Sequence, residues 1–369
     1  MSEKICVIGG LPESLINFRG DLLSSIKETD CEVLAMSAPA SEEVKQELTS
    51  KGVSFHSIPI RRNGLNPFGD LVLFWQLYRD YKKFKPRAVL AYTIKPVIWG
   101  GLAARLAGVP FYGLVTGLGF AFQGDGFKRK LLTLIVTKLY SSALKQANAV
   151  IFQNKDNRDV FIQRKIMHSD KCHVVNGSGV NISRFENKDI PEVEVTFLCV
   201  ARLLKEKGLR EYAAAAAVVK AKYPRVRFHL VGPEDPSPDG IPLSEVKAWD
   251  SIEYLGETED VRPFIEQCHV YVLPSYHEGL PRSTLEAMAV GRAVLTTDAV
   301  GCRETVVEGE NGFMVPVADH VKLADRMIWF IEHRLQLASM GKASRDLVEQ
   351  RFDVRKVNAD ILSIMELTD

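Results

Sequence analysis

Short apolar runs alternate with helical stretches along the whole chain, and this alternation limits the possible folds more than any other feature. The runs of strand type are residues 4–10, 31–36, 53–58, 87–92, 111–115, 149–152, 196–201, 227–231, 252–255, 269–273 and 294–297. Strands that alternate with helices form parallel sheets with helices on both faces. The chain has 369 residues, which is enough for two such domains with separate cores.

Residues 271–291 place a strand, a glycine-containing loop and a helix in direct succession. Pro281 suits the first position of a helix that runs through Met288, and Gly291 suits the left-handed residue at its end. The helix N-terminus then follows the strand end immediately. Its unpaired N–H groups and its positive dipole end favour an anionic ligand.

Two carboxylates frame this corner, Glu278 in the loop and Glu286 in the helix. A carboxylate accepts hydrogen bonds from two hydroxyls, so the pair suits the two sugars that flank a diphosphate. A second interpretation is purely structural. Glu286 lies four residues after Arg282 and can form a helical ion pair with it, and Glu278 can be an exposed loop residue.

Two cations follow the strand at 196–201. Arg202 lies at the strand end, and Lys207 lies at the turn into the next helix. Both positions are above the carboxyl edge of the predicted sheet, where open α/β folds bind ligands. Arg binds two phosphate oxygens with its planar guanidinium, and Lys acts as a compact charge, so the two residues suit a diphosphate.

The first strand ends in Gly9 and Gly10, and a helix follows. The turn lacks the full GxGxxG pattern, and the second strand ends without an acidic residue for a ribose. A nicotinamide-dependent enzyme is therefore disfavoured. Gly10 either lets a ligand approach the backbone or only forms a tight turn.

Basic residues concentrate in the first half of the chain. Residues 1–185 hold 25 Lys and Arg against 15 Asp and Glu, a net charge of +10, whereas residues 186–369 have a net charge of −9. The basic half predicts an anionic partner: a phosphorylated acceptor, an anionic membrane surface or a nucleic acid.

Two helical stretches of this half combine apolar, aromatic and basic residues. In residues 67–84, apolar side chains recur at helical spacing, and the residues concerned are Leu71, Phe74, Trp75, Tyr78 and Tyr81. This helix either packs in the core, which we favour for Leu71 and Phe74, or lies on a membrane surface.

The second stretch, 124–146, carries Lys128, Arg129 and Lys130 near its start, where cations oppose the helix dipole. The preceding loop, TGLGFAFQGDG (116–126), is rich in glycine and contains two phenylalanines. An external anion explains this arrangement better than any local contact. We therefore expect the two stretches to contact a membrane or lipid phosphates.

The sequence EGLPRSTLEAMAVGRAVLTT, followed by GCRE and NGFMVP, resembles the donor-site signature of the family 4 retaining glycosyltransferases. The R-x4-K-G arrangement of Arg202 and Lys207 resembles the diphosphate clamp of that family. The resemblance implies the GT-B architecture, an α/β fold in which two doubly wound, Rossmann-like domains face a central cleft. It places an N-terminal acceptor and membrane-facing domain at 1–185, with a returning helix at about 353–369, and a nucleotide-sugar-binding domain at 186–352.

The resemblance also assigns roles to individual residues. Glu278, Arg202 and Lys207 form the catalytic group, in which Glu278 holds donor-sugar hydroxyls and the two cations stabilise the departing diphosphate. The residues assigned to donor binding are Glu286 at the ribose, Gly279, Leu280 and Pro281 at the helix N-terminus, and Gly10, Gly232 and Gly256 at strand ends. No metal or other cofactor is expected, and no Asp-x-Asp motif is present to hold a metal.

The stretch YTIKPVIWGGLAARLAG (92–108) resembles the subgroup that acts on polyprenyl-diphosphate-linked glycans. Relatives place a histidine near this strand end, whereas this chain has Thr93 and Lys95. Lys95 either binds an acceptor phosphate or is a solvent-exposed lysine at a helix start. The implied reaction moves an N-acetylhexosamine such as GalNAc from a UDP-sugar, with retention, to a polyprenyl-diphosphate-linked saccharide in glycan biosynthesis.

The chain is expected to be cytoplasmic and peripheral on the inner face of the plasma membrane. No window of about 18 uncharged apolar residues predicts a membrane span, and the N-terminus leads directly into a strand without a signal peptide. The six cysteines lack metal-ligand spacing and are expected to be reduced. The partners expected are the nucleotide sugar, the lipid-linked acceptor and anionic lipid, with no nucleic acid.

Other functions remain open at this level. A glycosyltransferase of the same family can use a soluble acceptor or another lipid acceptor. A nucleotide-sugar 2-epimerase shares the architecture, but it needs catalytic carboxylates and a histidine that this pattern lacks. A non-catalytic protein that binds nucleotide sugars needs only the donor site.

Overall fold

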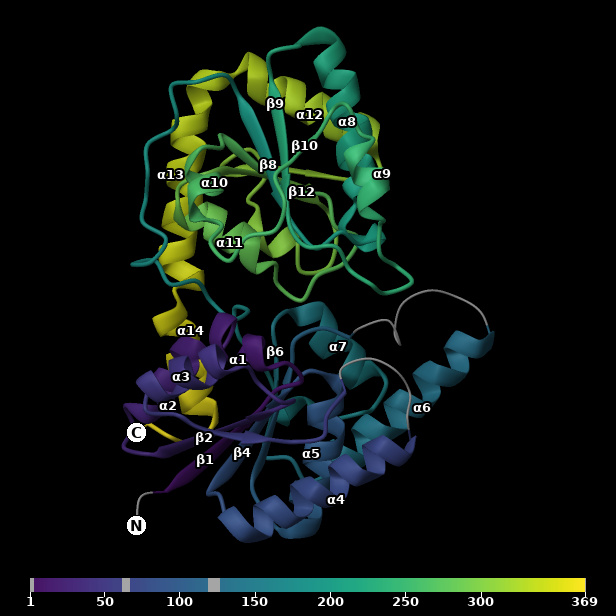
Figure 1. Ribbon diagram of the computed structural model, residues 1–369, viewed down its shortest axis with the longest axis vertical. Coiled ribbons are helices and arrows are strands. Elements are labelled where there is room, and N and C mark those ends of the chain that lie inside the picture. Colours follow the sequence, from purple (N-terminus) through teal and green to yellow (C-terminus); the bar gives the residue numbers. More distant parts are fainter. Residues whose placement is uncertain (1–2, 62–66, 119–126, 369) are drawn as a thin grey trace. The chain divides into compact units, whose positions relative to one another are not determined.

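The computed structural model describes residues 3–61, 67–118 and 127–368, with the side chains of 127–129 left out. The contacts divide the chain into two compact units, one formed by Met1–Ser178 with Val354–Asp369 and the other by Gly179–Asp353. The sequence prediction places the boundaries at 185 and about 353. Each unit is built around one parallel sheet (Figure 1).

The first unit holds a seven-stranded sheet in the order β3-β2-β1-β4-β5-β6-β7, and every pair is parallel. The strands are β1 Lys4–Ile8, β2 Glu32–Ser37, β3 Ser54–Ser57, β4 Ala88–Tyr92, β5 Phe111–Val115, β6 Ala149–Phe152 and β7 Cys172–Val174. The chain runs outward from β1 in one direction and then from β4 in the other. The gap between the carboxyl ends of β1 and β4 is thus a topological switch point, where such sheets bind ligands.

Helices cover both faces of this sheet. They are α1 Pro12–Asn17, α2 Gly20–Lys27, α3 Glu42–Ser50, α4 Pro67–Phe84, α5 Ile94–Ala107, α6 Phe127–Leu144, α7 Lys155–Gln163 and α14 Val354–Ile364. Alternate residues of β1 enter different cores: Ile5 and Val7 face the core that contains α14, and Cys6 and Ile8 face the core beneath α4 and α5. The C-terminal helix therefore belongs to the first unit, although the second unit precedes it in the chain.

Helix α4 corrects one expectation about the core. Leu71 was favoured as a core residue, but its side chain is 50% exposed, and Trp75 is also exposed. The buried residues are Leu73, Leu77, Asp80 and Tyr81, of which only Tyr81 belongs to the predicted face, while Phe74 packs partly buried against the core as expected. The helix has apolar residues nearly all round, so the sequence period did not identify the face that packs on the sheet.

The second unit holds a six-stranded parallel sheet in the order β10-β9-β8-β11-β12-β13. The strands are β8 Thr196–Val200, β9 Arg227–Val231, β10 Glu253–Tyr254, β11 Val270–Leu273, β12 Ala293–Thr297 and β13 Gly312–Val315. The order reverses between β8 and β11. This second switch point lies where the predicted cations and the Glu278 loop leave their strands.

The helices of the second unit are α8 Leu209–Lys222, α9 Leu243–Lys247, α10 Arg262–Glu266, α11 Arg282–Ala289, α12 His320–Glu332 and α13 Leu337–Leu347, followed by a π-helical turn at Val348–Phe352. Helix α11 begins one residue later than predicted, and Pro281 is its N-cap. Gly291 has a φ of +83°, as predicted for the residue that ends the helix. The two doubly wound sheets confirm the predicted fold class.

All six cysteines are buried and free, as expected for reduced thiols. Among residues 3–61, 67–118 and 127–368, no helix is both long enough and apolar enough to cross a membrane.

Candidate active site

Three turns meet at the carboxyl edge of the second sheet, after β8, β11 and β12. Gly208, in the turn after β8, has a φ of +67°, and a Cβ atom on it would lie 2.0 Å from the Pro274 carbonyl oxygen. Gly301, in the turn after β12, has a φ of +78°, and its Cβ would lie 2.4 Å from the Glu278 carbonyl oxygen. Only glycine permits both the left-handed backbone and the close approach. The Glu278 loop is therefore enclosed between the other two turns.

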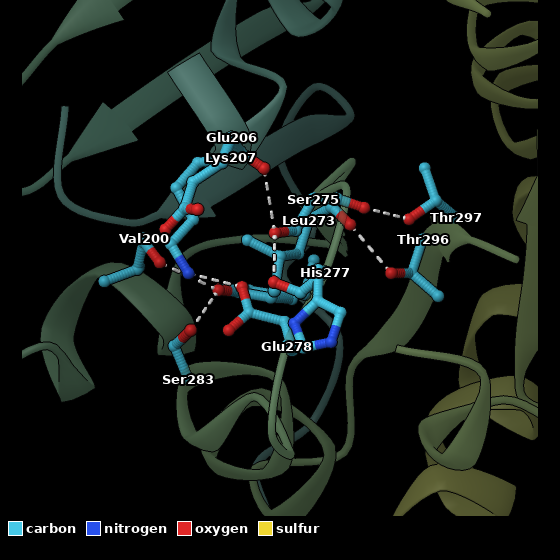
Figure 2. A network of polar contacts seen from close by, with 11 residues as sticks. Val200, Glu206, Lys207, Leu273, Ser275, His277, Glu278, Ser283, Thr296 and Thr297 are labelled. Carbon is cyan, nitrogen blue, oxygen red and sulfur yellow. Dashed lines mark hydrogen bonds and ion pairs between the residues drawn. The ribbon is translucent and has the colours of Figure 1, made fainter. Parts of the chain in front are cut away.

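Lys207 and Glu278 form an ion pair at this edge (Figure 2). The Lys207 ammonium lies 2.5 Å from Glu278 Oε1, and the two side chains are only 15% and 14% exposed. The 3-10 turn Lys205–Lys207 positions the cation, and the loop between β11 and α11 positions the carboxylate. The sequence assigned these residues to different parts of the donor, and the structure joins them directly.

Arg202 also has an acidic partner, which the sequence reasoning missed. Its Nη1 donates a hydrogen bond to Asp235 Oδ2 at 2.5 Å. Burial raises the pKa of Asp235, but hydrogen bonds from Ser237 and the charge of Arg202 outweigh burial and hold the pKa below its usual value. Asp235 follows β9, which is the neighbour of β8 in the sheet. An acidic residue just after that strand is the sequence feature that could have identified the partner of Arg202.

Glu286 lies on α11 and accepts a hydrogen bond from Arg282 Nε at 3.0 Å, which is the helical ion pair weighed as its structural alternative. Burial raises the pKa of Glu286, and the nearby charge of Arg282 opposes the rise. The carboxylate has a second oxygen with capacity for further hydrogen bonds. The ion pair is therefore compatible with a ribose ligand but does not require one.

The residues that lead into α11 differ in what they can offer an anion at the helix N-terminus. Gly279 and buried Leu280 lead into the N-cap Pro281, which has no N–H group to donate. Any anion contact at this helix start therefore depends on other amides of the turn.

Gly232 and Gly256 lie at the ends of β9 and β10, as predicted. Gly232 has a φ of +148°, and a Cβ on it would lie 1.9 Å from the Ala201 carbonyl oxygen. The Gly232 N–H donates to the Gly256 carbonyl at 2.9 Å. Packing beside Arg202 therefore accounts for the glycine at 232, whereas Gly256 has open space around it and is explained by its left-handed φ of +84°.

The remaining predicted residues lie in the first unit. Gly10 follows β1 at the switch point, and a Cβ on it would lie 3.5 Å from Thr93 Oγ1, after β4. Thr93 has a φ of +69°, which is rare for a β-branched residue. Lys95, in the first turn of α5, forms an ion pair with Asp70 of α4 at 3.0 Å and is 16% exposed. It is therefore not the solvent-exposed lysine considered as the alternative.

Lys130 is exposed on α6, whereas the side chains of Lys128 and Arg129 and most of the loop at 116–126 lie outside the described residues. No metal-binding group of three or more His, Cys, Asp or Glu residues occurs in the part of the chain that the structure describes.

Two family models match the chain. "Glycosyl transferase 4-like" matches residues 5–154, and "Glycosyl transferases group 1" matches residues 194–333. The two matches correspond to the two units.

Several curated relatives match over most of their length. An N,N'-diacetylbacillosaminyl-diphospho-undecaprenol alpha-1,3-N-acetylgalactosaminyltransferase from Campylobacter jejuni is 28% identical, covering 91% of this chain and 92% of that protein. The putative glycosyltransferase EpsD from Bacillus subtilis is 30% identical, covering 83% of this chain and 84% of that protein. A UDP-Gal:alpha-D-GlcNAc-diphosphoundecaprenol alpha-1,3-galactosyltransferase from Escherichia coli is 26% identical, covering 81% and 80%.

The fold also matches solved structures. Alr3699/HepE from Anabaena, solved in complex with UDP-glucose, has a TM-score of 0.80 at 20% identity, with 99% of this chain and 100% of that chain covered. The lipopolysaccharide outer core galactosyltransferase WaaB has a TM-score of 0.72 at 15% identity, with 99% and 100% covered.

Proposed function

This chain belongs to the family 4 glycosyltransferases with the GT-B fold, and we propose that it moves an N-acetylhexosamine such as GalNAc from a UDP-sugar to a polyprenyl-diphosphate-linked saccharide. Two relatives are named for transfer to undecaprenyl-diphosphate-linked sugars, one of them of GalNAc. A structural neighbour was solved with UDP-glucose, which supports UDP as the nucleotide.

The observation that carries the proposal is the pair of cations at the second switch point, each held in place by a carboxylate. Lys has three N–H donors and Arg has five, so both can donate to a diphosphate while they keep their carboxylate partners. Charge that develops on a leaving group is stabilised best by groups that are already oriented. Lys207 and Arg202 meet that condition.

In the proposed reaction, the bond between the sugar C1 and the β-phosphate oxygen breaks, and its electron pair stays on the phosphate. The acceptor hydroxyl attacks C1 from the side of the leaving group, so the configuration is retained, and its proton passes to the phosphate. Lys207 and Arg202 stabilise the departing diphosphate without requiring a metal. Glu278 accepts hydrogen bonds from the donor sugar, and Glu286 from the ribose.

The decisive experiment measures UDP release from UDP-GalNAc with and without a polyprenyl-diphosphate-linked saccharide. Release that requires the acceptor, together with a product one sugar longer, supports transfer. Conversion of the donor to an epimer without acceptor would identify an epimerase. Binding of UDP-GalNAc with neither reaction would identify a non-catalytic protein.

Replacing Glu286 with alanine is expected to weaken UDP binding about tenfold, because one or two hydrogen bonds to a charged acceptor are lost. Isothermal titration calorimetry with UDP measures the change. Glu253→Ala, on an exposed carboxylate of β10, serves as the control for a charge change elsewhere in the unit. An unchanged UDP affinity in Glu286→Ala would leave Glu286 with only its helical ion pair.

We also propose that α4 and α6 bind an anionic membrane. Both pack beside α5, and both keep large apolar side chains in water. The exposed apolar residues are Phe68, Leu71, Val72 and Trp75 on α4, and Leu131, Leu134 and Ile135 on α6. Exposed basic residues accompany them, namely Arg79, Lys82 and Lys83 on α4, and Lys130 and Lys138 on α6. Apolar and basic side chains together suit the interface of an anionic bilayer.

Co-sedimentation with liposomes tests the membrane proposal. Lys130→Glu with Lys138→Glu is expected to reduce binding to anionic vesicles at least tenfold, because each cation near such a surface contributes about 1 kcal/mol. Phe68→Ser with Trp75→Ser is expected to reduce binding to all vesicles, because apolar insertion is lost. Lys322→Glu, exposed on α12, is the control. If the unaltered protein binds anionic and neutral vesicles equally well, the proposal is contradicted.

A further inference from the structure

Ser275 links the two segments that carry Lys207 and Glu278 (Figure 2). Its side chain is completely buried, and its Oγ donates to the Glu206 carbonyl at 3.1 Å, with the His277 carbonyl at 3.4 Å as a longer alternative. The Tyr276 N–H donates to the same Glu206 carbonyl at 2.8 Å. The residue immediately before Lys207 thus accepts two hydrogen bonds from the Glu278 loop.

Strand β12 holds the same loop from the other side. Thr297 is buried, and its Oγ1 donates to the Ser275 carbonyl, while Thr296 Oγ1 donates to the Leu273 carbonyl at 2.7 Å. The Glu278 N–H donates to the Val300 carbonyl at 2.9 Å. Three backbone segments are thereby joined around one carboxylate. Three of the bonds come from buried hydroxyls, and those of Ser275 and Thr297 involve the loop residue Ser275 itself.

Neither hydroxyl is needed to fill space. Valine has nearly the shape of threonine and is favoured in buried strands, and alanine would fit where Ser275 lies. Burying a hydroxyl costs free energy unless the hydroxyl is hydrogen-bonded. The contribution of the hydroxyls at these positions therefore comes from the hydrogen bonds they make to the loop segments. Those bonds restrict the Glu278 loop and the Lys207 turn to a single relative position.

We propose that Ser275 and Thr297 are positioning residues that fix the Glu278 loop against the Lys207 turn, so that cation and carboxylate meet the donor as one unit. This inference rests on the proposed function, because it assumes that the pair acts on the donor diphosphate and sugar. Both hydroxyls are directed at backbone carbonyls of the loops, and they act only through Lys207 and Glu278. Reactive groups held within fractions of an ångström depend on such supporting bonds.

The test compares Thr297→Val with Thr297→Ser, because only the second keeps the hydroxyl. Thr297→Val and Ser275→Ala are expected to lower kcat about fivefold to tenfold, because each loses the free energy of one hydrogen bond. Thr297→Ser is expected to keep kcat within about twofold of that of the unaltered enzyme. Thr196→Val is the matched control. Thr196 is a buried threonine at the start of β8, whereas the Lys207 turn follows the end of that strand. The Thr196→Val variant is expected to lower Tm without lowering kcat.

A double-mutant cycle separates positioning from a general loss of stability. In a Lys207→Ala background, adding Ser275→Ala is expected to change kcat less than twofold, because Ser275 fixes Glu278 relative to Lys207 and that cation is gone. An undiminished loss in that background overturns the proposal. Equal kcat values for the valine and serine variants at position 297, or an equal loss in Thr196→Val, also overturn it.

Hydrogen exchange keeps this test independent of the enzymatic reaction. Thr297→Val and Ser275→Ala are expected to speed exchange of the Tyr276 and Glu278 amides at least fivefold, and Thr196→Val is not. Unchanged exchange contradicts the positioning role whatever the protein catalyses. Faster exchange in a protein that transfers no sugar would contradict the proposed function and leave the loop linkage supported.

Discussion

Replacing Lys207 with alanine is expected to lower kcat by a factor of about 100 to 1,000, the range typical for removing one preorganised group that stabilises transition-state charge. The substitution removes a cation from the edge where the leaving diphosphate is proposed to gain charge, and it also leaves Glu278 without its partner. Initial rates of UDP release with saturating donor and acceptor measure the change. Binding of UDP should weaken less than turnover falls, because the diphosphate carries more charge when it departs.

Lys205→Ala is the matched control for this result. Lys205 belongs to the same 3-10 turn, is exposed, and donates to the Pro238 carbonyl at 3.3 Å rather than to a carboxylate of the site. It is expected to keep kcat within about threefold, as for most surface substitutions. Equal activity of the Lys207→Ala and unaltered enzymes would remove the diphosphate clamp from the proposed mechanism.

Replacing Glu278 with glutamine is expected to lower kcat at least a hundredfold, because two functions are lost in one nearly isosteric change. The charge that holds the Lys207 ammonium disappears, and the carboxylate proposed to accept donor-sugar hydroxyls becomes a weaker amide acceptor. Affinity for UDP alone should remain within about threefold, since UDP has no donor sugar for Glu278 to contact. Steady-state kinetics and UDP calorimetry on the same preparation distinguish the two effects.

Glu259→Gln is the control for this change, because Glu259 is an exposed carboxylate in the loop after β10 of the same unit. The double variant Lys207→Ala with Glu278→Gln should lose much less than the product of the two single losses, since each single change disables the same pair. Fully multiplicative losses would show that the two residues act independently and would contradict a shared role.

The strand and helix alternation was sufficient to predict two doubly wound sheets, because a chain with this pattern can bury its apolar runs only between helical layers. Faces of individual helices were harder to predict. In α4, Leu71 and Leu73 look equally apolar in the sequence, yet Leu71 is half exposed and Leu73 is buried. The position of the neighbouring sheet determines which of the two residues is buried, and the local periodicity of the sequence carries no information about that position.

Candidate residues were found in the sequence by their place at strand ends and by their resemblance to a family motif, but their partners were not. Asp235 was missed as the partner of Arg202, and the Lys95–Asp70 pair was not anticipated. Ser275 and Thr297 gave no signal, since serine and threonine are common in loops and strands. Only the contacts identify these residues.

The sequence by itself located most of the strands, predicted the left-handed backbone at Gly291 and placed charged groups near strand ends, but it did not predict β13 at Gly312–Val315. The tertiary structure alone decided that Lys207 and Glu278, 71 residues apart in the chain, form one ion pair. The physical reason is strand order: β8 pairs with β11 across a reversal that no local propensity encodes. Gly208 after β8 and Gly301 after β12, which have no side chains, then let these two turns approach the backbone of the Glu278 loop closely.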